Sequence, residues 1–325
     1  MAPEKLRKII WIVAAALLAA LVFYSLFTMD MLGNVFTVMS IGFIAGVPFC
    51  IGAFTIFLCD VKLIAKRRFV IWMSIAPILA FFLLTLALAM EGWACWLMIL
   101  PFFLALSVAG GLVMARIRLK NLKDRMYMSF FALLPFAVAP VEQAIASIPG
   151  RYTADTAIEI KADKAVIWSM VTRVKKIEAA EDKGWFTRML GFPRPLEAEL
   201  DYEGTGAFRK AVFDKGLVFD EKVTAYQHQR FMQFTIRANP YDIPSTTMDE
   251  HIVVGGKYFD VLDGTYELQP LANNTYRLHL YSHYKLSTSF NFYSSWWAGW
   301  IMKDIQNNIL QVIKSRAEQA ATVKQ

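Results

Sequence analysis

Residues 9–29 read IIWIVAAALLAALVFYSLFTM, a stretch of 21 residues without a charged side chain. An α-helix rises about 1.5 Å per residue, so about 20 apolar residues are enough to cross the hydrocarbon core of a bilayer. The stretch is too long for the apolar region of a secretory signal, and no small-residue cleavage site follows it. The chain is therefore predicted to begin with a transmembrane helix.

The whole chain is 56% hydrophobic, and similar apolar stretches follow along its first half. They cover residues 36–59, 69–90, 94–115 and 126–148. The last of them contains Glu142 and Gln143 near its C-terminal end and is the weakest of the five. The sequence predicts an α-helical membrane bundle of about five spans over residues 1–149 and a second domain over residues 150–325.

Basic residues alternate along the connections between these stretches. Lys and Arg occur in the N-terminal segment and in the second and fourth connections, at Lys5, Arg7, Lys8, Lys62, Lys66, Arg67, Arg68, Arg116, Arg118, Lys120, Lys123 and Arg125. The positive-inside rule then favours an integral, multi-pass protein with a cytoplasmic N-terminus and the second domain on the extracytoplasmic side. If the fifth stretch re-enters instead of spanning, the second domain is cytoplasmic.

The second domain is nearly neutral, with 22 Lys and Arg against 21 Asp and Glu. The net charge of +7 therefore belongs almost entirely to the apolar half, which argues against a nucleic-acid partner. The sequence has no Cys/His zinc spacing, Gly-rich phosphate loop or Ser-His-Asp order, so we expect neither a metal nor a cofactor. His279 and His283 share the polar face of a predicted strand and are expected to face solvent.

Patterning in the second domain predicts an α+β fold. Thr156–Ile160 is typical of a short strand, Asp163 is placed to cap a helix, and a second helix is expected over Lys176–Leu190. A long amphipathic helix over Ser289–Ala320 closes the chain. Between these helices the strands expected from alternation and turn signals are residues 196–203, 207–213, 217–226, 230–237, 251–254, 257–262, 265–271 and 276–286.

This order of elements resembles the helix-grip fold of the START-like superfamily, which includes polyketide-cyclase-like and lipid-transfer proteins. The opening residues 160–168, IKADKAVIW, resemble the strand and helix with which the family begins. The central hairpin is matched by Gly206-Ala207-Phe208-Arg209 with Phe213, Gly216 and Phe219–Val223, and the late strands by Tyr266–Pro270 and Tyr276–Leu278. The resemblance covers about residues 152–320. It implies a curved antiparallel sheet around the last helix, with a cavity for an apolar ligand between them.

One hairpin is expected to place a charged pair in this cavity. The turn Asp214-Lys215-Gly216 fits a three-residue hairpin loop with Gly at the left-handed position. This register sets Arg209 opposite Glu221 and Ala211 opposite Phe219, on the apolar face. The expected ligand-binding residues are Arg209, Ala211, Phe213, Phe219 and Glu221, together with Tyr284 on a late strand and Trp297 on the last helix. A structural ion pair is the alternative interpretation of Arg209 and Glu221.

Three functions remain open from the sequence. The first is a membrane-tethered binding module that holds a lipid, a quinone or another small hydrophobic molecule. The second is an enzyme of the cyclase or hydratase kind that uses the same cavity, although catalysis is less expected than binding. The third is a sensor or assembly partner of another membrane protein. The expected partners are thus the lipid bilayer, a small hydrophobic ligand and, in the third case, a protein.

Overall fold

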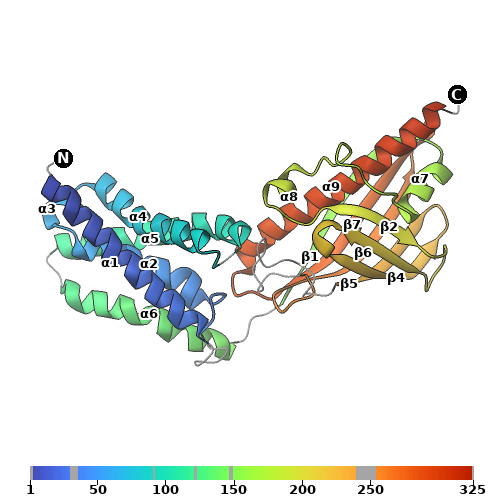
Figure 1. The fold of residues 1–325 in the computed structure, drawn as a ribbon. Helices are drawn as coiled ribbons and strands as arrows, with labels where there is room; N and C mark the ends of the chain where they lie inside the picture. The colour runs from blue at the N-terminus through green and yellow to red at the C-terminus, as the bar shows by residue number, and fades with distance from the viewer. Residues whose placement is uncertain are drawn as a thin grey trace. The chain divides into compact units, whose positions relative to one another are not determined.

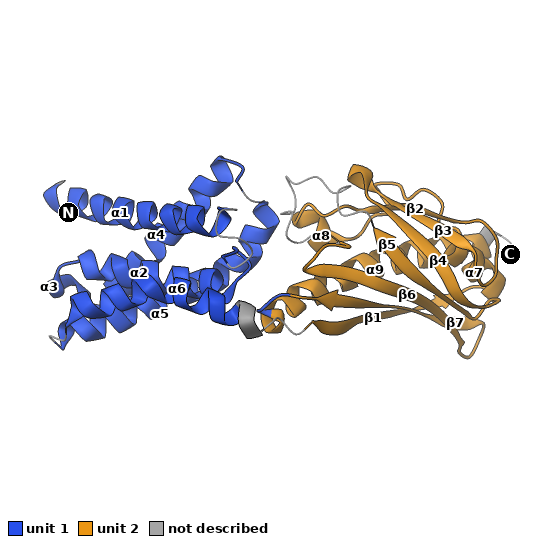
Figure 2. Cartoon of the chain, turned by 90° about the horizontal axis from the view of Figure 1, so that it is seen from below, with its two compact units in different colours: residues 1–148, 288–290 blue, residues 149–287, 291–325 orange. Residues whose placement is uncertain are grey.

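The computed structural model describes residues 3–29, 36–90, 92–120, 123–145, 149–238 and 254–323. The chain forms two compact units (Figures 1 and 2). Unit 1 comprises residues 1–148 and 288–290, and unit 2 comprises residues 149–287 and 291–325. The strand expected at residues 251–254 lies, except for Val254, outside the described residues.

Unit 1 is helical. Its elements are α1 (Pro3–Thr28), the short π-helical turn η2 (Gly42–Gly46), α2 (Val47–Leu58), α3 (Val61–Ile64), α4 (Arg67–Ala87), α5 (Trp93–Leu119) and α6 (Asp124–Ile145). Helices α2 and α5 approach so closely that a Cβ on Gly52 would lie 1.8 Å from the carbonyl oxygen of Ser107. Gly110 is equally restricted, by the carbonyl oxygen of Phe49 at 2.0 Å. Small residues thus allow backbone contact, as in helix pairs packed within membranes.

Three helices in the described part of unit 1 are long and apolar enough to cross a membrane: α1 from Glu4, α4 and α5. The expectation of about five spans is not supported. The second apolar stretch is helical only over Gly42–Leu58 and is short for a span. Helix α6 bears Asp124, Arg125 and Glu142, and the Glu142 carboxylate accepts a hydrogen bond of 2.6 Å from the backbone N–H of Ile41. Polar residues therefore lower the apolar character of α6.

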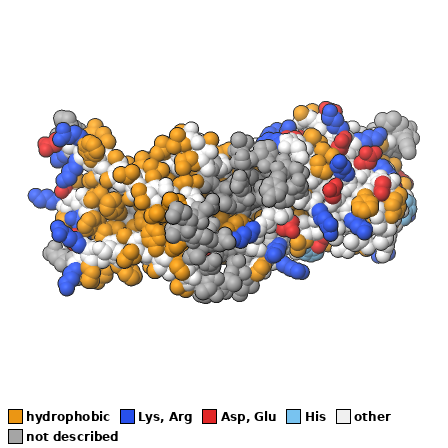
Figure 3. Space-filling model, turned by 60° about the horizontal axis from the view of Figure 1, so that its bottom comes forward, with side chains coloured by type: hydrophobic (Ala, Val, Ile, Leu, Met, Phe, Trp, Pro, Cys, Tyr) orange, Lys and Arg blue, Asp and Glu red, His pale blue; other side chains and the backbone are white. Residues whose placement is uncertain are grey.

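The surface of unit 1 is largely apolar. On the face shown in Figure 3, hydrophobic side chains cover most of this unit, and Lys and Arg side chains gather at one end. The contacts at this end include Lys8 with Asp60 at 2.9 Å and Arg118 with the carbonyl oxygen of Cys59 at 2.5 Å. Large hydrophobic side chains that are more than half exposed include Trp11, Leu18, Val22, Trp72, Leu83 and Leu133. Apolar exposure of this extent is typical of helices that face lipid.

Unit 2 is α+β. Its elements are β1 (Gly150–Lys161), α7 (Lys164–Thr172), α8 (Trp185–Met189), β2 (Pro195–Leu200), β3 (Phe208–Phe213), the 3-10 turn η3 (Asp214–Gly216), β4 (Val218–Gln227), β5 (Phe231–Ala238), β6 (Phe259–Pro270), β7 (Thr275–Leu286) and α9 (Asn291–Val323). The seven strands form one antiparallel sheet in the order β1-β7-β6-β5-β4-β3-β2. The sheet is curled, and the long helix α9 runs along it (Figure 1).

Within the described residues, the predicted order of elements is confirmed, with two corrections. The helix capped by Asp163 is present, and the Asp163 carboxylate accepts a hydrogen bond of 2.8 Å from the N–H of Ala165. The helix expected over Lys176–Leu190 is wrong except for the short α8. Residues 175–183 are instead irregular, because α9 satisfies their backbone groups: Arg316 donates to the carbonyl oxygens of Lys175 and Lys176 at 2.7 and 2.6 Å.

The second correction concerns β6. Asp263-Gly264 was expected to form a turn between two strands, but both residues lie inside β6, beside a bulge. The ring of Phe234 on β5 occupies the space in which a Cβ at position 264 would lie, 2.7 Å from its ring atoms. Glycine is therefore present at this position because an aromatic side chain packs over the strand, and not because the chain reverses there.

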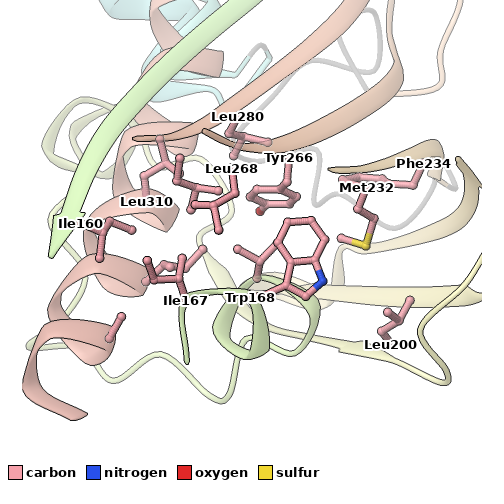
Figure 4. Close-up of a cluster of buried hydrophobic side chains, with 14 of the residues drawn as sticks. Ile160, Ile167, Trp168, Leu200, Met232, Phe234, Tyr266, Leu268, Leu280 and Leu310 are labelled. Atoms are coloured by element: carbon pink, nitrogen blue, oxygen red, sulfur yellow. The ribbon is translucent and has the colours of Figure 1, made fainter. Parts of the chain in front are cut away.

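The core of unit 2 lies between the sheet, α7 and the C-terminal half of α9 (Figure 4). Ile160, Trp168 and Leu278 are at most 1% exposed and pack with Leu310 and Ile313 of α9. The Trp168 indole N–H donates to the Tyr226 hydroxyl at 2.9 Å, so the polar edge of the ring is satisfied. This half of the unit is solidly filled.

Candidate functional site

A cavity of about 130 Å³ lies between the sheet and the N-terminal half of α9. Helix α9 contributes Ile301, Ile305 and Ile309 at turn-by-turn spacing, because residues four apart share a helix face. The loop before β2 contributes Val174 and Ile177. The sheet wall includes Ala198, Ala211, Phe213, Leu217, Phe219, Phe234, Ile236, Val261, Tyr266 and Leu280. The cavity is thus lined mainly by apolar and aromatic side chains.

The β3–β4 hairpin carries the charged residues of the wall. Its observed register pairs Arg209 with Glu221 and Ala211 with Phe219, which confirms the predicted pairing. Gly216 has a φ of 85°, in the left-handed region expected for this turn. Because side chains alternate across a strand, residues 209, 211 and 213 share the face that is turned toward the cavity.

Arg209 and Glu221 form a buried ion pair. The Arg209 Nη1 donates to the Glu221 Oε2 at 2.5 Å, and both side chains are 4% exposed. The guanidinium carbon lies 5.4 Å from the ring centroid of Phe234 and 5.8 Å from that of Tyr266, within the range of a cation–π interaction. Burial raises the pKa of the Glu221 carboxyl, and Arg209 opposes this shift. Burial lowers the pKa of Arg209, but the interactions with Glu221 and Tyr266 together outweigh burial, so the net direction is upward.

The ion pair leaves one donor unused. Arg209 Nε is buried and has no hydrogen-bond partner among the residues that the structure describes. A buried donor of a charged group is costly when it is unpaired. By contrast, the polar side chains of the facing wall are satisfied. Gln306 of α9 accepts from Thr156 at 3.2 Å and donates to Ser282 at 3.1 Å.

Five of the seven residues predicted from the sequence come together in the cavity wall: Arg209, Ala211, Phe213, Phe219 and Glu221. Tyr284 lies in a neighbouring cluster, where its ring stacks on Tyr152 at 5.7 Å. Trp297 stacks on Phe186 at 6.2 Å and is not part of the wall.

Other residues of the cavity wall were not predicted from the sequence. Gln306 lies four residues after Met302 and three before Ile309, so helical spacing was a signal that could have identified it. Tyr266 and Phe234 were harder to find, because their place depends on strands that pair across the centre of the sheet.

Histidines and carboxylates form no comparable site. In the described part of the chain, no group of three His, Cys, Asp or Glu side chains is arranged to hold a metal ion. His283 is 43% exposed and its Nδ1 lies 2.7 Å from Asp263, outside the cavity wall. His279 lies on the same face of β7, away from the buried Leu278, Leu280 and Tyr284.

No protein-family model and no curated protein matches the chain. Several solved structures are similar to its C-terminal half. A protein from Nitrosospira multiformis is 12% identical, with a TM-score of 0.32 and a match over 53% of this chain and 99% of that chain. A norcoclaurine synthase point mutant of Thalictrum flavum, in complex with a transition-state analogue, is 11% identical, with a TM-score of 0.34 and coverages of 53% and 98%.

A third similar structure is Ara h 8.0201, which is 10% identical, with a TM-score of 0.31 and coverages of 52% and 99%. These neighbours are START-like, polyketide-cyclase-like proteins, the group that the sequence pattern resembles. At such identities and TM-scores the likeness assigns neither a family nor a function to this chain. Its fold rests on its own strand order and register.

Proposed function

We propose that the chain is a membrane-tethered binding protein that holds a small hydrophobic molecule in the cavity of unit 2. The observation that carries the proposal is an apolar cavity whose wall, as far as the structure describes it, contains one buried ion pair. Sites for small ligands are concave and mainly apolar, with a few polar groups that fix the orientation of the ligand. Arg209, Glu221 and Gln306 supply such groups.

Tethering suits this ligand class because apolar molecules are concentrated in the bilayer. Helices α1, α4 and α5 supply the apolar length for a membrane anchor. The basic residues gathered at one end of unit 1 support a cytoplasmic N-terminus (Figure 3). Helix α6 begins at that end and runs toward the other end of unit 1 (Figure 1). The proposal therefore includes an extracytoplasmic unit 2. Reporter fusions after residues 120 and 325 test this topology, and activity of an extracytoplasmic reporter only at residue 120 would contradict it.

Copurification tests the binding function. The full chain is purified in mild detergent beside Ala211→Trp, which fills the cavity, and Ala157→Trp, a matched control on the exposed face of β1. Molecules extracted from each are compared by mass spectrometry. We expect a small apolar compound with the unchanged chain and with Ala157→Trp, and its loss with Ala211→Trp. Identical extracts from all three proteins would contradict a ligand-binding cavity.

Catalysis in the same cavity is the second candidate. The observation that favours it is the Glu221 carboxyl, which lines the cavity and has a pKa raised by burial, the direction that favours a carboxyl as a general acid or base. Glu221→Gln separates the two functions. A binding protein keeps its ligand in this variant, whereas an enzyme keeps binding but loses turnover. The protein partner expected as a third possibility stays a prediction.

A further inference from the structure

Exposed large apolar side chains gather on two helices of unit 2. They are 49–69% exposed, and we call them the aromatic patch: Trp185 and Met189 of α8 with Phe292, Trp296 and Trp300 of α9. Single exposed apolar residues are common on protein surfaces and need no explanation. A group of such residues on adjoining helices instead marks a surface that contacts a membrane or another protein.

Contacts between the two helices hold the patch together. Helix α8 lies beside the N-terminal half of α9 (Figure 1). The Asp304 carboxylate of α9 accepts a hydrogen bond of 2.9 Å from the Thr187 N–H and one of 2.7 Å from the Thr187 hydroxyl. The Phe186 ring contacts both helices, with its centroid 5.6 Å from that of Trp185 and 6.3 Å from that of Trp300. The exposed rings are therefore fixed parts of one surface.

The charge around the patch is positive. Residues 183–196 and 291–303 contain no Asp or Glu, and their basic residues are Lys183, Arg188, Arg194 and Lys303. Arg188 and Arg194 share the carboxylate of Asp182, which balances part of this charge, and Lys183 and Lys303 are exposed. Tryptophan flanked by Lys and Arg is typical of the membrane–water interface, where rings lie at the level of the headgroups and cations meet lipid phosphates. The composition thus favours lipid over a protein partner.

The patch also lies on the part of α9 that directly follows unit 1 in the chain. Residues 288–290 belong to unit 1, and α9 begins at Asn291. At a rise of about 1.5 Å per residue, Trp296 and Trp300 lie about 8 and 14 Å along the helix from that first residue. Unit 1 contains the three helices that are long and apolar enough to cross a membrane. The short connection keeps a bilayer that contains unit 1 within reach of the patch.

We infer that the aromatic patch binds the interfacial region of the bilayer that anchors unit 1. The inference rests on the membrane tethering in the proposed function, but it does not depend on a ligand. Phe292, Trp296 and Trp300 are spaced four residues apart, and Lys303 follows on the same face of α9. The rings enter the headgroup region, and Lys303 meets the phosphates. Ile301, next to Trp300, lines the cavity, so this contact also brings one part of the cavity wall close to lipid.

Fluorescence quenching by lipid tests the contact. The cysteines of the chain, Cys50, Cys59 and Cys95, are replaced by alanine, and a fluorescent label is attached after either Trp296→Cys or Phe208→Cys. Phe208 on β3 is the matched control, because it is 61% exposed against 64% for Trp296 and lies outside the patch. Each full chain is reconstituted into vesicles of phosphatidylcholine and phosphatidylglycerol, with or without a phosphatidylcholine that carries a nitroxide on the upper part of an acyl chain.

We expect the nitroxide lipid to quench most of the fluorescence of the label at Trp296→Cys and little of that at Phe208→Cys. Trp300→Cys repeats the measurement if the Trp296→Cys chain does not reconstitute. Equal quenching of the patch and control labels, weak or strong, overturns the inference. A patch label that is shielded from water but not quenched also overturns it, because a protein surface then covers the patch. Release of the chain from the vesicles by alkaline carbonate would instead contradict the membrane anchor of the proposed function, and the inference with it.

Discussion

The two halves of α9 face the same sheet, yet one half meets a filled core and the other a cavity. Toward the C-terminus, Leu310, Ile313 and Ala317 are at most 1% exposed and pack against Trp168 and its neighbours (Figure 4). Toward the N-terminus, Ile301, Ile305 and Ile309 line open space. The two apolar faces are similar, so the difference comes from what lies opposite them.

Opposite the filled half, α7 inserts Ile167 and Trp168 between helix and sheet. Opposite the open half, no helix in the described part of unit 2 inserts such a side chain, and the wall contains the small residues Ala198, Ala211 and Ser282. The cavity therefore results from small residues in its wall and from the lack of a large inserted side chain such as Trp168. It does not result from a weaker apolar face on α9. Four predictions test this contrast, from the largest expected effect to the smallest.

Glu221→Leu should be the most damaging change in the open half. It leaves the Arg209 guanidinium buried without its counter-charge, which typically destabilises a protein by about 3–5 kcal/mol. Hydrogen exchange of the slowest amides of β7 in the full chain measures this loss. Arg209→Leu combined with Glu221→Leu is the control and should recover much of the stability. A harmless single variant would mean that the pair is not buried.

Ile313→Ala and Ile305→Ala compare the same truncation in the two halves. Ile313 is 1% exposed in the filled core, so its truncation leaves a new void and should cost about 2–5 kcal/mol. Ile305 borders existing space and is only partly buried, so its loss should cost about 1 kcal/mol. Thermal unfolding of both variants gives the two values. Equal losses would erase the distinction between the halves.

Ala317→Leu and Ala211→Leu make the opposite test. Ala317 is fully buried, and added methylene groups in a filled core cost about 1–3 kcal/mol. Ala211 borders the cavity, so the same side chain has room and should leave stability unchanged or slightly increased. The unfolding midpoints of the two variants are the measurement. A strongly destabilised Ala211→Leu would show that the space is not available to a side chain.

Arg316 links the filled half of α9 to the cavity wall, and its substitution should give the smallest loss of stability. This residue of the filled half holds Glu181 with two bonds of 2.7 and 2.8 Å and so positions the loop that carries Ile177 into the cavity wall. The hydrogen bond from Arg316 lowers the pKa of Glu181 to about 2, against the effect of burial. A lowered pKa in the folded state means that this stabilisation is present above about pH 4.5 and is lost as the pH falls through about 2.

Arg316→Lys keeps the charge but loses the paired geometry, so it should remove on the order of 1 kcal/mol at pH 7 and flatten this acid dependence. Hydrogen exchange in the 175–183 loop between pH 7 and pH 3 is the measurement. Lys314→Ala, two residues earlier on α9, is the matched control and should change little, because the ion pair of Lys314 with Glu318 is a long 3.8 Å. The same acid dependence in Arg316→Lys as in the unchanged chain would contradict the role of this contact.

Much of unit 2 followed from local sequence. The spacing of Ile301, Ile305 and Ile309 defined the apolar face of α9, because helical periodicity depends only on neighbours along the chain. The pairing of Arg209 with Glu221 followed from the length of one turn, because a hairpin fixes its register locally. The charge pattern and the apolar stretches likewise identified an apolar helical half without any tertiary information.

Contacts between distant segments decided the rest. The sequence could not show that Arg316 replaces a helix at residues 176–183 with an irregular loop, or that Phe234 makes Gly264 part of a strand. It placed Tyr284 and Trp297 beside the ligand, whereas packing against Tyr152 and Phe186 places both elsewhere. Inward orientation is set by the alternation of side chains along one strand. Whether an inward position borders a filled core or open space depends on the side chains that all surrounding elements bring to it. Only the tertiary structure determines which side chains these are.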